Sequence, residues 1–176
     1  MVYLKRASGV TLIEMMVAIL IMAIISGAIA STFYVARNYY FSENQRIKNQ
    51  QGASLFLLAL EKTIRKASSA VVYDNFTSLN QAPSGTCLKL VDYYGTPTDF
   101  TDDTTYWFYL SGNNIYRQVI PPSGARDPEL LAHNINPATF IFTQNNLYIQ
   151  TSFQTLGNTT EHLLPLSYQT GIQLRN

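Results

Sequence analysis

Glu14 is the residue whose chemistry constrains this chain most, because it is a carboxylate inside a long apolar run. Residues 10–30 read VTLIEMMVAILIMAIISGAIA, in which only Thr11, Glu14 and Ser26 are polar. A helix that is apolar on every side lies in lipid or in protein, and these 21 residues would rise about 32 Å, enough to cross a hydrocarbon core of about 30 Å. Because an ionised carboxylate in hydrocarbon costs about 2.5 to 3.5 kcal/mol, Glu14 calls for a cationic partner.

Three interpretations of this N-terminal region compete. In the first it is a signal peptide that is cleaved after Ala30, which would release a secreted β-rich binding module. In the second it stays uncleaved and anchors that module, with Lys5 and Arg6 held in the cytoplasm. In the third the chain is cut after Gly9, so that Val10 carries a free ammonium group one helical turn from the carboxylate. Of the three, only this cut supplies the cation.

The residues around that cut resemble a known signal. The run KRASGVTLIEMMVA, residues 5–18, resembles the prepilin signal of type IV pilins and type II secretion pseudopilins. The resemblance implies that a membrane-embedded aspartic peptidase cuts after Gly9 on the cytoplasmic face and that Val10 is then N-methylated. It also implies that Glu14 helps to recruit each subunit and to set its register in a filament. Lys5 and Arg6 would be the basic residues of the leader.

The same resemblance implies partners and a location. The partners would be other pilin or pseudopilin subunits, the prepilin peptidase, the inner-membrane assembly machinery and, before assembly, the membrane itself. The protein would be a single-pass protein of a bacterial inner membrane with its head outside the cytoplasm, and later part of an extracellular or periplasmic filament. Its tyrosine-rich head and the ending Leu174-Arg175-Asn176 look like those of minor pilins or the J-type pseudopilin.

Proline divides the chain into a helical part and a part that cannot be one helix. No proline precedes Pro83, and all seven prolines lie from there onward. Apolar residues at spacings of three and four, such as Leu57, Leu60 and Ile64, predict that the helix continues with one apolar face as far as residue 72. We therefore expect four segments: a leader at 1–9, a transmembrane and filament-core helix at 10–31, its amphipathic continuation at 32–72, and a β-rich head at 73–176.

Within the head the hydrophobic period shortens to that of strands. Runs rich in aromatic and β-branched residues predict six strands, near residues 86–93, 105–110, 114–120, 139–143, 147–153 and 166–174. Gly112-Asn113 and Asn145-Asn146 lie between pairs of these runs, and both residue types tolerate the positive φ of hairpin turns. The sequence therefore predicts an α+β fold, in which the C-terminal half of a long N-terminal helix packs on a small antiparallel β-sheet head.

Few other residues could support metal chemistry. Asp99, Asp102 and Asp103 share a polar loop and could offer oxygen ligands to calcium, but their spacing lacks the EF-hand pattern, and a solvated loop is the preferred interpretation. His133 and His162 have no partner at metal-binding spacing and are expected to have surface or capping roles. We therefore expect no cofactor, with calcium as the one alternative.

The remaining composition argues against catalysis and nucleic-acid binding. Cys87 is the single cysteine, which excludes an intramolecular disulfide and favours a small buried thiol. From residue 73 onward there are four basic and eight acidic residues, so the head lacks the cationic surface that binds phosphates tightly. No nucleophile elbow, phosphate-binding loop or HExxH motif is present, and we expect no enzymatic activity.

Overall fold

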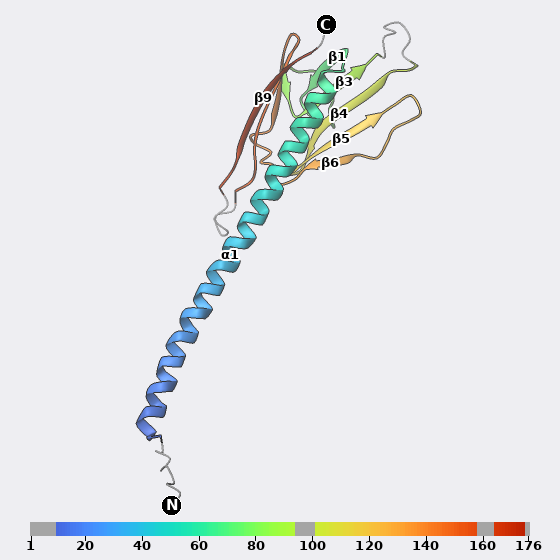
Figure 1. Ribbon diagram of the computed structural model, residues 1–176. Helices are drawn as coiled ribbons and strands as arrows, with labels where there is room; N and C mark the ends of the chain where they lie inside the picture. The colour runs from blue at the N-terminus through green and yellow to red at the C-terminus, as the bar shows by residue number, and fades with distance from the viewer. Residues whose placement is uncertain (1–9, 94–100, 158–163, 175–176) are drawn as a thin grey trace, which may run out of the picture. The chain divides into compact units, whose positions relative to one another are not determined.

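The computed structural model describes residues 10–93, 101–157 and 164–174 (Figure 1). The chain divides into two compact units, one up to Ser42 and one from Glu43 onward, and each is described by itself. Helix α1, Leu12–Ile64, forms the helical part of the described residues of the first unit and continues into the second. Together with the nine strands of the described residues it forms the expected α+β fold, in which one long N-terminal helix packs against antiparallel sheets.

Helix α1 ends eight residues before its predicted end. The sequence predicted a helix to residue 72, whereas the helix stops at Ile64 and Ser69–Tyr73 form strand β1. The spacing of Ala67 and Val71 fits a helix, but the alternation that buries Ala70 and Val72 decides the outcome. As a strand, this segment gains pairing with β3 along its whole length, and its β-branched residues favour that state. The amphipathic continuation at 32–72 is therefore wrong beyond residue 64.

Glu61, in the last turn of α1, forms an ion pair with Arg65, which follows the helix. Arg65 Nη2 lies 2.6 Å from Glu61 Oε1, and the same carboxylate oxygen accepts a second hydrogen bond from Arg65 Nε at 3.0 Å. Both side chains are largely exposed, so the pair supports the helix locally and contributes little to the stability of the fold.

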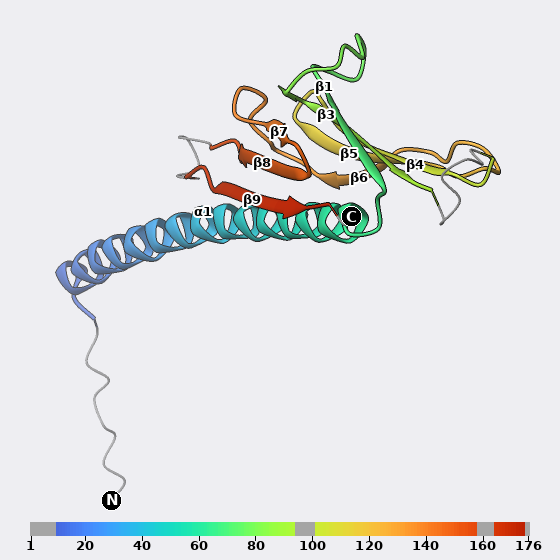
Figure 2. The ribbon, with the colours of Figure 1, turned by 90° about the horizontal axis from the view of Figure 1, so that it is seen from above.

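In its described residues the head contains two antiparallel sheets where one was expected. The first has the order β1-β3-β4-β5-β6 and the second the order β2-β7-β8-β9. Figure 2 shows both sheets on the same side of the C-terminal part of α1. The strand bounds after β1 are Ser84–Gly85 (β2), Cys87–Asp92 (β3), Thr104–Ser111 (β4), Asn114–Ile120 (β5), Glu129–Ala132 (β6), Ile141–Asn145 (β7), Tyr148–Gln154 (β8) and Ser167–Gln173 (β9).

All six predicted strands are present, and both hairpins are confirmed. Ser111 pairs with Asn114 around a two-residue turn in which Gly112 has φ 58°, and Asn145 pairs with Tyr148 around Asn146 with φ 53°. Strands β1, β2 and β6 were not predicted. Two of them are too short to show a period, and β1 lies where a helical spacing was read.

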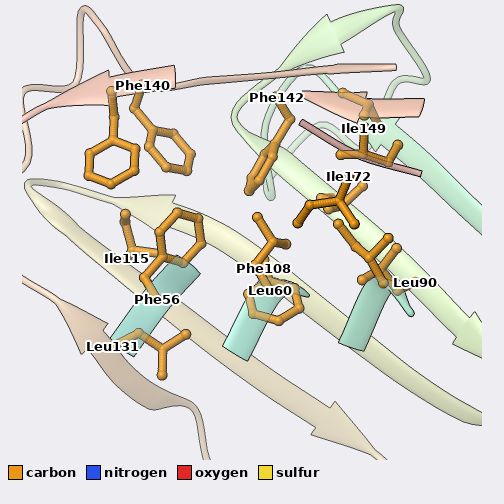
Figure 3. Packing of buried hydrophobic residues seen from close by; sticks show 14 of the residues in the cluster. Phe56, Leu60, Leu90, Phe108, Ile115, Leu131, Phe140, Phe142, Ile149 and Ile172 are labelled. Atoms are coloured by element: carbon orange, nitrogen blue, oxygen red, sulfur yellow. The ribbon is translucent and has the colours of Figure 1, made fainter. Parts of the chain in front are cut away.

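A phenylalanine of α1 joins the two sheets into one core. Phe56 is fully buried, and its ring centroid lies 5.5 to 6.3 Å from those of four other phenylalanines: Phe108, Phe140, Phe142 and Phe153. Phe108 belongs to β4 of the first sheet, and Phe142 and Phe153 belong to the second. Figure 3 shows Phe56 and Leu60 between residues of both sheets. The second half of α1 is therefore the element on which both sheets meet.

Gly52 allows α1 to approach strand β6 closely. A Cβ atom added at this glycine would lie 3.3 Å from Ala132 Cα, a backbone atom that a side-chain rotation cannot move. One turn earlier, the buried Asn49 accepts a hydrogen bond from Asn134 Nδ2 at 3.3 Å. The glycine that interrupts the helical pattern thus serves as a packing site on an unbroken helix.

The opposite face of the five-stranded sheet carries a second, aromatic cluster. Phe76, in the loop after β1, stacks on Tyr109 with centroids 3.9 Å apart and lies 5.7 Å from the Trp107 ring. The loop is folded around Asp74, whose Oδ1 accepts hydrogen bonds from the Asn75 backbone N–H at 2.6 Å and from the Ser78 hydroxyl. These bonds hold Phe76 over the sheet.

Candidate functional site

The N-terminus of α1 is closed by a reciprocal pair of side chains. Thr11 immediately precedes the helix, and its backbone N–H donates to Glu14 Oε2 at 2.8 Å. In return, the Glu14 backbone N–H donates to Thr11 Oγ1 at 3.3 Å, and the Thr11 hydroxyl donates to the same Oε2 at 3.0 Å. This arrangement is a capping box, which satisfies backbone donors that otherwise lack partners in the first helical turn.

The capping box places the Glu14 carboxylate at the positive end of the helix dipole. That position stabilises a negative charge electrostatically in addition to the hydrogen bonds. Glu14 Oε2 accepts both hydrogen bonds from Thr11, one from its backbone N–H and one from its hydroxyl. Within the described residues, Glu14 Oε1 accepts no hydrogen bond. One carboxylate oxygen thus closes the helix, while the other can accept a hydrogen bond from an outside donor.

The helix around this carboxylate presents apolar side chains to its surroundings. Large apolar residues throughout 10–30 are about half or more exposed: Val10, Leu12, Ile13, Met15, Met16, Val17, Ile19, Leu20, Ile21, Met22, Ile24, Ile25 and Ile29. Within the described part of the chain, α1 is a helix long and apolar enough to cross a bilayer, by its length and composition. A surface of this kind is stable against lipid or against other apolar helices.

Polar groups at the far end of the apolar segment are satisfied within the helix. The hydroxyls of Ser31 and Thr32 both donate to the Ala28 carbonyl oxygen, at 2.8 and 2.9 Å. These bonds remove two polar groups that would otherwise need water, so the segment can be surrounded by lipid as far as residue 32.

Some predicted site residues lie outside the described residues. Lys5, Arg6 and Gly9 do so, and the proposed cleavage position after Gly9 therefore has no structural description. Val10 is described and is 70% exposed, directly before the Thr11 cap. The structure thus places Val10 and Glu14 at the same end of α1, and residues 1–9 lie outside the described residues.

The calcium alternative gains no support from the described residues. Asp102 and Asp103 lie next to the start of β4, and Asp99 lies outside the described residues, as does His162. Among the side chains that the structure describes, no three His, Cys, Asp or Glu residues come together in a way that could hold a metal ion. His133 is described and only partly buried.

Cys87 is a buried thiol, as its surrounding sequence predicted. Its side chain is fully inaccessible, and burial, with a smaller effect from the negative charge of Asp74, raises its pKa to about 12. A thiol with this pKa is almost entirely protonated at neutral pH, so Cys87 is a poor nucleophile.

Sequence reasoning missed the part that Thr11 plays. The signal was present, because Thr11-Leu12-Ile13-Glu14 is a T-x-x-E capping-box pattern directly before an apolar run. The role predicted for Glu14 depended on its charge and did not include hydrogen bonds with its own helix. The carboxylate therefore has an intramolecular role in addition to any role between subunits.

Comparison with known proteins identifies this same region. Residues 4–30 match a family model described as the prokaryotic N-terminal methylation motif. No curated protein and no solved structure matches the chain. The match covers residues 4–9, the capping box and the apolar segment, which carry the candidate site.

Proposed function

We propose that this chain, a type IV pilin-like protein that carries the prokaryotic N-terminal methylation motif, is a filament subunit cut after Gly9 and assembled through the first part of α1. Proteins of this class are structural and not enzymatic. The motif implies a prepilin peptidase and other pilin subunits as partners, and an inner-membrane anchor before assembly. The observation that carries the proposal is an exposed apolar helix with one carboxylate at its entry, within the segment that matches the motif.

Processing gives the carboxylate its partner. A cut after Gly9 makes Val10 the first residue and places a positive ammonium group directly before the capping box. In an assembled filament, Glu14 Oε1 of one subunit accepts a hydrogen bond from the Val10 ammonium of a neighbour, while Oε2 keeps its bonds to Thr11. The same carboxylate thus closes its own helix and binds the next subunit.

This pair sets the axial register of the subunits. Apolar helices slide past each other at little cost, because one apolar contact resembles another. A buried charge that loses its partner is expensive, at about 3 to 5 kcal/mol. A neighbour shifted along the axis would leave both the carboxylate and the ammonium unpaired among apolar side chains. The in-register arrangement is therefore the stable one.

The mature N-terminus decides between this function and its rivals. Intact mass and N-terminal sequencing of the protein from its native membrane are expected to give a chain that starts at Val10, with one additional methyl group. A start at Ser31 would instead support the secreted β-rich module, and an intact Met1 would support the plain anchor. Either of these results would overturn the proposal.

The charge of Glu14 is tested by Glu14→Gln. The amide oxygen of glutamine can still accept the Thr11 N–H, so this variant keeps the cap and removes only the charge. We expect normal membrane insertion and cleavage but no incorporation into filaments, measured by immunoblotting of membrane and sheared-filament fractions. Glu14→Ala is expected to behave in the same way. Normal incorporation of both variants would exclude the register mechanism.

We further propose that the chain is a minor subunit, either a minor pilin or a J-type pseudopilin. The support is the resemblance of its tyrosine-rich head and C-terminal residues to those proteins. Quantitative mass spectrometry of purified filaments is expected to find it far below the most abundant subunit. Equal abundance would make it a major subunit instead.

A further inference from the structure

We propose that residues Phe33–Phe41 form an aromatic belt that binds the outer headgroup interface of the bilayer and fixes the depth of α1, so that Glu14 stays at the cytoplasmic edge. The proposal rests on the membrane anchoring included in the proposed function. Its partner is a lipid bilayer interface, before the subunit enters a filament.

Aromatic residues are concentrated in one short part of the first unit. None occurs between residues 10 and 32, and five occur between 33 and 41: Phe33, Tyr34, Tyr39, Tyr40 and Phe41. All five are more than half exposed, with Tyr34 at 68% and Tyr40 at 66%. Tyrosine suits the headgroup region because its ring is apolar while its hydroxyl can contact water or lipid carbonyls.

The distance from Glu14 to the belt matches the thickness of the hydrocarbon core. Phe33 lies 19 residues after Glu14 in the same helix, a rise of about 29 Å, against a core of about 30 Å. A helix whose aromatic residues sit at the outer interface therefore brings its carboxylate to the inner one. Between the two, every large side chain is apolar, and the Ser31 and Thr32 hydroxyls bond to Ala28.

The belt also carries a cation suited to lipid phosphates. The Arg37 guanidinium carbon lies 5.5 Å from the centre of the Phe41 ring. Arginine stacked on a ring keeps its donors free to reach phosphate oxygens, and its stem covers apolar surface. At about 100° per residue, Phe33, Tyr34, Arg37, Tyr40 and Phe41 lie within about 120° of the helix circumference, and Tyr39 lies on the other side. Aromatic rings thus reach the interface on both sides of the helix.

Fixing the depth of the helix benefits both steps of the proposed function. A carboxylate at the edge of the bilayer remains hydrated and so avoids the cost of entering hydrocarbon. The bond after Gly9, five residues earlier in the chain, stays on the side where the peptidase is expected to act. Without the belt, an apolar helix could shift along the membrane normal at small cost, because each ångström of hydrophobic mismatch between helix and bilayer costs only a fraction of a kcal/mol.

Depth-dependent fluorescence quenching tests the proposal in the full-length chain. Single-tryptophan variants are made in a Trp107→Phe background, with tryptophan at position 40 or 22 through Tyr40→Trp or Met22→Trp. Each is reconstituted in phosphatidylethanolamine and phosphatidylglycerol vesicles whose acyl chains are brominated close to the headgroup or close to the chain end. Tyr40→Trp is expected to lose more emission with the shallow bromines, and Met22→Trp with the deep ones.

A matched pair of variants tests whether the aromatic residues set the depth. Tyr34→Ser, Tyr40→Ser and Phe41→Ser together are expected to make tryptophan at position 22 respond similarly to shallow and deep bromines. The control carries Val35→Ser, Ala36→Ser and Asn38→Ser in the same region, and it should keep the deep profile. Equal profiles for both triple variants would overturn the belt.

The outcomes separate this inference from the proposed function. If Met22→Trp is quenched by deep bromines while Tyr40→Trp is quenched by neither lipid and emits as in water, the anchor stands and the belt is wrong. If Tyr40→Trp is shielded from water but quenched by neither lipid, the aromatic residues contact neighbouring subunits, and the belt is again wrong. If Met22→Trp is unquenched as well, the membrane anchoring fails, and the belt fails with it.

Discussion

Thr11 and Glu14 hold each other at the N-terminus of α1, each side chain accepting a hydrogen bond from the backbone N–H of the other. This reciprocity gives the single carboxylate of the apolar segment a function within its own chain. It also means that removing Glu14 changes two things at once, the helix cap and the charge. Glu14→Ala does not separate them, whereas Glu14→Gln keeps the cap and removes only the charge.

Thr11→Ala separates the cap from the charge. This variant removes the hydroxyl that caps the first turn and should destabilise the end of the helix by about 1 kcal/mol, while it leaves the carboxylate in place. We expect hydrogen exchange of the first-turn amides to accelerate and filament incorporation to persist. Incorporation as poor as that of Glu14→Gln would show that assembly needs the cap as well as the charge.

Phe56→Ala should lower the stability of the head more than a truncation on the exposed side of the same helix. The ring packs among four phenylalanines, three of which belong to the two sheets, and truncation of such a residue costs about 3 to 5 kcal/mol. The control is Leu58→Ala, at a position that is 64% exposed, where a change within about 0.5 kcal/mol is expected. Near-UV circular dichroism of the full chain in detergent, as a function of urea, measures both. Similar losses of stability in the two variants would exclude Phe56 as the residue that joins the sheets.

Asp74 should make the stability of the head depend on pH on the acidic side. The hydrogen bond from Ser78 lowers the pKa of its carboxyl below the ordinary value of 3.8, with further contributions from Asn75 and Asn80. A folded-state pKa below the unfolded value contributes stability that is fully present above the unfolded pKa and is lost as pH falls through the folded one. We therefore expect the urea midpoint to decrease below about pH 4 through this group.

Asp74→Asn is the control for that dependence. The urea midpoint of this variant should decrease less at acidic pH than that of the unmodified chain, because the variant lacks the ionised carboxylate that accepts the hydrogen bonds. Trp107, the single tryptophan, has its ring 5.7 Å from that of Phe76, which lies in the same loop as Asp74. Its fluorescence therefore reports unfolding of this part of the head. An unchanged pH profile in the variant would contradict the role assigned to the Asp74 carboxylate.

The sequence alone was enough for the N-terminal segment, for the class of fold and for six of the strands. These features depend on local signals: the apolar run around Glu14, the absence of proline before Pro83, and the alternation along each strand. The turns at Gly112 and Asn146 were predictable for the same reason, since positive φ is a property of single residues.

Tertiary structure alone decided where α1 ends, how many sheets there are and which residue joins them. Residues 65–72 carry a spacing that fits a helix, and only pairing with β3 makes Ser69–Tyr73 a strand. The division into two sheets and the central position of Phe56 depend on contacts between segments that are distant in sequence. Periodicity tells which face of an element is apolar, but it carries no information about which other element will cover that face.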